Sequence, residues 1–112
     1  MNFAVNVDEN SGSYAVVSVR GEIDLHTAPQ VKHTIEQAAG NGSETVVVDM
    51  SGIAFMDSTA LSTFMRAKDS LEERGVSLRL AKPSHAVERI FSVTGFGDYF
   101  DIFSSREAAM SV

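Results

Sequence analysis

Cysteine and tryptophan are both absent from the 112 residues, and proline occurs only twice. Without cysteine the chain has no disulfide, no thiolate nucleophile and no thiolate metal ligand, which fits a reducing compartment. Cations are also scarce, since nine Lys and Arg residues against fifteen Asp and Glu residues give a formal net charge of −6. Because proteins that bind nucleic acid normally carry a basic patch, we expect no direct contact with DNA or RNA.

Long apolar segments are missing as well. No stretch approaches the roughly 20 apolar residues that cross a bilayer, and residues 1–8 lack the basic and apolar regions of a signal peptide. We therefore expect a cytoplasmic protein with no membrane partner. A hydrophobic fraction of 44% over 112 residues is typical of one folded unit, so we predict a single domain over residues 1–112.

Strand and helix patterns alternate along the chain. Strands are predicted at residues 3–7, 14–20, 45–50, 76–81 and 100–102, and helices at 27–39, 57–73 and 84–94, with a brief helix after residue 104. The order β-β-α-β-α-β-α-β-α predicts an α/β domain with a small, mostly parallel sheet and an antiparallel edge strand. Right-handed crossovers should place about four helices mostly on one face of the sheet.

The connecting segments carry capping and turn signals. Residues 21–26 and 51–56 are predicted to be loops. Thr27 with Gln30, and Ser104 with Glu107, fit capping boxes at two helix starts. Asp49 follows an apolar run, so we expect its carboxylate to meet solvent at a strand end.

The most informative segment is F-M-D-S-T at residues 55–59, between a buried strand and the longest helix. Asp57, Ser58 and Thr59 all favour a helix N-terminus, and composition alone favours a simple capping role. The same geometry would expose the Ser58 hydroxyl in the first helical turn. A phosphate there would meet free backbone N–H groups and the positive end of the helix dipole.

Several motifs together resemble the anti-sigma-factor antagonists of the STAS-domain family. They are the G-E-I-D segment at 21–24, the V-V-V-D-M strand at 46–50, the F-M-D-S-T segment and the Leu80-Ala81 strand end followed by an Arg-Ile-Phe helix. The resemblance covers essentially the whole chain and implies the STAS fold. Many members have glycine where this chain has Ala60, which makes a stiffer helix start.

The resemblance implies a switch by partner exchange. Ser58 would be phosphorylated by an anti-sigma factor that is a GHKL-type serine kinase, with Thr59 as the second candidate acceptor. The unphosphorylated chain would bind the kinase and free the sigma factor, and a PPM-type serine phosphatase would restore it. The candidate contact residues are Asp24, Met56, Asp57 and Thr59. For Asp24, a plain Asx-turn is an equally good interpretation.

Other function classes fit less well. A response-regulator receiver built on Asp49 would need an adjacent acidic pair, which Glu22 and Asp24 do not form. A hydrolase would need a nucleophile elbow, which is absent, and His26, His33 and His85 lack ligand spacing. We therefore predict no enzyme activity, no metal site and no cofactor. The main alternative is a STAS subunit of an ABC-type lipid transport complex that binds its partner constitutively.

The aromatic residues gather near the end of the sequence. Phe96, Tyr99, Phe100 and Phe103 fall within eight positions. Core packing of a last strand explains most of this cluster. Phe96, flanked by two glycines, is the member that we expect to stay exposed and available to a partner.

Overall fold

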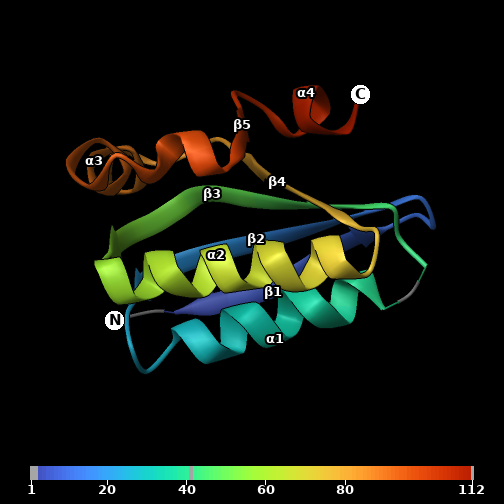
Figure 1. Cartoon of the computed structure of the whole chain (residues 1–112), viewed down its shortest axis with the longest axis horizontal. Coiled ribbons are helices and arrows are strands. Elements are labelled where there is room, and N and C mark those ends of the chain that lie inside the picture. Colours follow the sequence, from blue (N-terminus) through green and yellow to red (C-terminus); the bar gives the residue numbers. More distant parts are fainter. Residues whose placement is uncertain (1–2, 41, 112) are drawn as a thin grey trace.

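The computed structural model describes residues 3–40 and 42–111, and within them the chain forms five strands and four α-helices (Figure 1). In chain order the elements are β1 Ala4–Asn10, β2 Tyr14–Ile23, α1 Ala28–Ala39, β3 Thr45–Met56, α2 Ser58–Glu73, β4 Ser77–Ala81, α3 His85–Thr94, the 3₁₀ helix η1 Phe96–Tyr99, β5 Asp101–Phe103 and α4 Arg106–Met110. The predicted order of strands and helices is confirmed.

The sheet has the strands in the order of the sequence, β1-β2-β3-β4-β5. β1 and β2 form an antiparallel hairpin, and the later neighbours are parallel. From β2 to β5, each new parallel strand is added on the same side of the previous one. Right-handed crossovers therefore place the connecting helices α1, α2 and α3 on one face. In Figure 1, α1 and α2 lie side by side against this face.

The main core lies between that face and the helices. Alternate residues of the central strands, such as Val46, Val48 and Met50, point into it, and the fully buried Phe64 enters it from α2. Inward residues Val87 and Phe91 place α3 on the same core. This layer holds the start of α2 fixed relative to the ends of the strands.

The last helix is the exception to the expected one-sided arrangement. Ala109 of α4 packs with Val16, Val47 and Ala81 on the opposite face of the sheet. α4 follows the final strand and is not part of a crossover, so the handedness rule does not place it. The prediction that helices lie mostly on one face is therefore confirmed for α1, α2 and α3.

The loop predicted at residues 51–56 was wrong, and the loop predicted at residues 21–26 was wrong for residues 21–23. β2 continues through residues 21–23 and β3 through residues 51–56, and the two extensions pair with each other. The pairing shifts register twice, between Ser18 and Arg20 and between Gly21 and Glu22. Such bulges interrupt the period-2 alternation by which a strand is detected in sequence, so the extension resembles a loop.

The prediction for Asp49 was also wrong. Its side chain is 5% exposed in the middle of β3, and its Oδ2 accepts a hydrogen bond of 2.7 Å from Nε of Arg106 on α4. The hydroxyl of Ser51 donates to the other carboxylate oxygen at 2.7 Å. A buried charge needs such partners, and the cation that makes burial possible comes from 57 residues further along the chain.

The second predicted capping box did not form as expected. Ser105 is the N-cap of α4, and its hydroxyl accepts from the N–H of Ala108 at 3.0 Å. The helix begins at Arg106, and its N-cap lies one residue after the expected cap Ser104.

Candidate functional site

The start of α2 presents two hydroxyl groups to solvent. Asp57 has an extended backbone, and its carboxylate accepts a hydrogen bond of 2.9 Å from the N–H of Ala60. Ser58 and Thr59 follow in the first helical turn, and both are exposed, while Ala60 and Leu61 are buried. The capping function therefore belongs to Asp57, and the hydroxyl of Ser58 is left accessible at the positive end of the helix.

Asp24 organises a tight turn at the end of β2. Its Oδ1 accepts hydrogen bonds from the N–H of His26 at 2.9 Å and the N–H of Thr27 at 3.2 Å, so the Asx-turn is present. The N–H of His26 makes the largest contribution to lowering the pKa of Asp24 below its ordinary value. The carboxylate is thus held as an anion in a half-buried loop.

The same turn explains why the capping box predicted for Thr27 and Gln30 does not form. The hydroxyl of Thr27 donates to the carbonyl oxygen of Glu22 at 2.9 Å and accepts from the N–H of Asp24 at 3.0 Å. Being engaged with the preceding loop, this hydroxyl makes no capping bond to α1. Thr27 closes the turn onto the end of β2 instead.

The extended pairing of β2 and β3 brings the two predicted site segments together. Ile23 lies opposite Met56 in the register, so Asp24 and Asp57 follow neighbouring strand ends. Met56 itself is 4% exposed and packs in the core. Of the predicted contact residues, Asp24, Asp57 and Thr59 reach the surface, whereas Met56 offers little surface to a partner.

Sequence reasoning missed two exposed apolar side chains at this end of the molecule. Leu25 is 66% exposed beside Asp24, and Phe55 is 48% exposed beside Met56. In residues 53–56, Ile53 and Met56 are buried and the two residues between them are exposed, so the burial does not follow the period-2 alternation of a regular strand. The sequence pattern therefore gives no simple signal for the exposure of Phe55.

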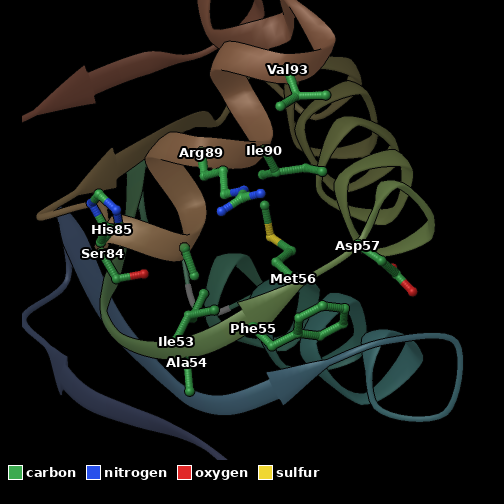
Figure 2. Close-up of a pocket in the computed structure, with 11 residues that line it drawn as sticks. Ile53, Ala54, Phe55, Met56, Asp57, Ser84, His85, Arg89, Ile90 and Val93 are labelled. Atoms are coloured by element: carbon green, nitrogen blue, oxygen red, sulfur yellow. The ribbon is translucent and has the colours of Figure 1, made fainter.

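A groove runs between the end of β3 and α3 (Figure 2). It has a volume of about 850 Å³ and is lined by residues 53–57 of the strand side and residues 84–86, 89, 90 and 93 of the helix side. Its apolar lining includes Ile53, Met56, Ile90 and Val93. One sequence feature could have indicated this groove: Val93 is apolar but lies off the helical face defined by Val87 and Phe91. In the structure its side chain is 74% exposed.

The histidines and the other potential metal ligands are dispersed over the described part of the chain. His26, His33 and His85 are all exposed. Residues 3–40 and 42–111 contain no group of three His, Cys, Asp or Glu side chains placed to hold a metal ion. Within the same part of the chain, no helix is both long and apolar enough to cross a membrane.

Comparison with known proteins assigns the family. The STAS domain model matches residues 4–109, so the chain belongs to the STAS domain family. The anti-sigma-B factor antagonist of Listeria monocytogenes is 33% identical over 102 residues, which cover 91% of this chain and 90% of that protein.

Two solved structures have the same fold. A crystal structure of an anti-sigma factor antagonist from Mycobacterium paratuberculosis has a TM-score of 0.83 and 24% identity, covering 98% of this chain and 92% of that one. The Bacillus cell fate determinant SpoIIAA in its phosphorylated form has a TM-score of 0.70 and 22% identity, covering 96% and 97%. The predicted STAS fold is therefore confirmed.

Proposed function

We propose that this chain is an anti-sigma factor antagonist whose binding is switched by phosphorylation of Ser58. The unphosphorylated form binds an anti-sigma factor that is a GHKL-type serine kinase, and this binding frees the sigma factor. The kinase uses ATP to phosphorylate Ser58 and leaves the complex, and a PPM-type phosphatase resets the chain. Since ATP and sigma factors are cytoplasmic, so is the switch.

The observation that carries the proposal is the exposed Ser58 hydroxyl directly after a capped helix start. Because Asp57 holds the N–H of Ala60, the fold does not need the Ser58 hydroxyl as a cap. A phosphate on Ser58 finds unpaired first-turn N–H groups and a favourable helix dipole. The modification is then compatible with an intact domain, as a reversible switch requires.

The charge of the phosphate supplies the energy for release. Phosphorylation adds about −1.5 to −2 charges at neutral pH. Placed next to Asp57 and near Asp24, this charge enlarges an acidic surface at the ends of β2 and β3. Unfavourable charge contacts in an interface cost several kcal/mol, and each 1.4 kcal/mol weakens binding about tenfold.

The relatives support the same role. The Listeria protein is named an anti-sigma-B factor antagonist, and SpoIIAA has a structure in a phosphorylated form. In this role the chain contributes a binding surface and a phosphate acceptor, and the catalytic groups belong to the kinase and the phosphatase.

The experiment is phosphorylation of the purified chain by its cognate anti-sigma factor kinase with ATP. Mass spectrometry is expected to locate the phosphate on Ser58. Ser58→Ala should bind the kinase with unchanged affinity and stay bound when ATP is added. Ser58→Asp should keep the wild-type melting temperature and bind the kinase at least about tenfold more weakly.

Thr59→Ala is the matched control, because it removes the neighbouring exposed hydroxyl of the same helical turn. It is expected to be phosphorylated like the wild type. Labelling that survives in Ser58→Ala would move the acceptor to Thr59 or elsewhere. A collapsed melting temperature in Ser58→Asp would make Ser58 a structural residue, and stable capture of an ABC-type ATPase instead of a kinase would contradict the proposed function.

A further inference from the structure

The groove between β3 and α3 has the size and the lining of a small-molecule site. Its volume of about 850 Å³ lies in the range of roughly 300–1,000 Å³ that is usual for such sites. Ile53 and Met56 line it from β3, and Ile90 and Val93 line it from α3. A ligand that fills it must therefore bring an apolar body.

One cation interrupts this apolar lining. Figure 2 shows the guanidinium of Arg89 turned into the groove, above the side chains of β3. Within residues 3–40 and 42–111, Arg89 has no hydrogen bond and no ion pair, in contrast to Arg106, which pairs with both Asp49 and Asp8. A guanidinium that faces apolar side chains without a partner favours an incoming carboxylate, which it can bind through two parallel hydrogen bonds.

The other ionisable groups of the groove do not neutralise Arg89. The carboxylate of Asp57 points away from the groove in Figure 2, and its Oδ1 is engaged by the N–H of Ala60. His85 lies at the opposite end, beside Ser84, whose hydroxyl accepts from the N–H of Val87 at 3.3 Å. Glu88, the nearest acid in sequence, lines a different depression with Pro83 and Ile102.

We propose that this groove binds a small amphipathic carboxylate, with the carboxylate on Arg89 and an alkyl chain along Ile90 and Val93, above a floor formed by the nearly buried Ile53 and Met56. The apolar lining contacts the chain, and the single unpaired guanidinium selects the anionic end. This site is distinct from the Ser58 hydroxyl and needs no protein partner to be occupied.

The test is a titration of the ¹⁵N-labelled full chain with octanoate and decanoate, followed by amide chemical shifts. Saturable shifts are expected at residues 53–57 and 85–93. Decanoate should bind more tightly than octanoate, by up to about fourfold for each added methylene. Octanol, which has the same chain without the charge, should bind at least about tenfold more weakly than octanoate.

Two variants separate the contributions. Arg89→Ala should abolish the preference for octanoate over octanol, whereas Arg66→Ala, which removes an exposed guanidinium from α2, should bind octanoate as the wild type does. Ala86→Phe, which adds a ring to the lining, should block all three probes. If that variant fails to fold, Val93→Asp serves instead, because this exposed position tolerates a charge that repels the carboxylate.

Equal binding of octanoate and octanol, or shifts spread outside the groove, would overturn the proposal. The proposal would also be overturned if the amide shifts of the groove residues did not respond to millimolar octanoate and decanoate but changed when a purified anti-sigma factor kinase binds. The groove would then be a docking site for a protein segment. None of these outcomes depends on whether Ser58 is phosphorylated, so the two proposals fail independently.

Discussion

Adjacent residues at the start of α2 have separate tasks. Asp57 closes the helix through the N–H of Ala60, and Ser58 remains exposed with no part in that cap. The same separation occurs at Asp24, whose carboxylate fixes a turn while Leu25 next to it is exposed. In both places a structural carboxylate directly precedes the side chain that a partner can reach. Substitution of the exposed residue then tests binding with little disturbance of the fold.

The buried carboxylate of Asp49 should make the stability of the fold depend on pH. Burial opposes ionisation of its carboxyl group, but hydrogen bonds from Ser51 and Arg106 outweigh it, and the pKa of Asp49 lies below its ordinary value. A group with a lowered folded pKa contributes stability that is present above the unfolded pKa, about 3.9, and is lost as pH falls through the folded pKa. Stability from Asp49 should therefore disappear in acid.

Asp49→Asn is expected to lower the free energy of unfolding by about 2 to 3 kcal/mol at pH 7, because it weakens a charge-assisted contact with Arg106. The difference from the wild type should shrink below about pH 4, as measured by urea unfolding at a series of pH values. Asp98→Asn, in an exposed position of η1, should change the free energy by less than about 0.5 kcal/mol throughout. A difference for Asp49→Asn that stays constant down to pH 2.5 would contradict the argument.

At the scale of elements, the sequence predicts those helices and strands whose apolar residues recur at a regular spacing. The helices and the valine-rich first halves of β2 and β3 were predicted because their spacing repeats. The second halves were not, since two register shifts break the alternation between Ser18 and Glu22. Ser58 and Asp57 were found from a local motif, whereas the groove depends on two segments that only the fold brings together.

Gly52 is the residue that allows this irregular extension. A Cβ atom at this position would lie 2.6 Å from Cβ of Arg20 and 3.3 Å from the carbonyl oxygen of Val19. β2 and β3 approach each other too closely here for any side chain. The close approach leads directly into residues 53–57, which form one side of the groove and end at the cap of α2.

Gly52→Ala is therefore expected to destabilise the chain by about 1 to 3 kcal/mol, because β2 and β3 must move apart. In amide spectra, the largest shifts should extend from residue 52 to the start of α2. Ala54→Val, at an exposed position of the same strand, is the control and should leave the urea midpoint nearly unchanged. Equal midpoints for the two variants would mean that the strands accommodate the added methyl group.

At the scale of the whole molecule, α4 covers a face that the other helices leave open. Its Ala109 packs on Val16, Val47 and Ala81, and its Arg106 reaches Asp49 and also Asp8 of β1, at 2.8 Å. Nε and Nη2 of this one side chain thus tie the last helix to the middle and to the edge of the sheet. The main core on the opposite face does not depend on these contacts.

Ending the chain after Ser104 removes Arg106 and Ala109 together. We expect a loss of about 3 kcal/mol or more in the free energy of unfolding, since Asp49 is left buried without its cation. Binding of the dye ANS should rise, because Val16 and Val47 become exposed. Deleting residues 111 and 112 alone is the control, with wild-type stability expected. Unchanged stability after the longer truncation would show that α4 is only loosely attached.

The contact between Arg106 and Asp8 also has a consequence for biosynthesis. Each strand–helix–strand step of this sheet joins neighbours in sequence, so these steps can form as the chain emerges from the ribosome. The ion pair, by contrast, joins residues that are 98 positions apart. Until residue 106 has left the ribosome, Asp49 of the nascent chain is without its cation. The layer on the second face of the sheet can therefore form only after all five strands have been synthesised.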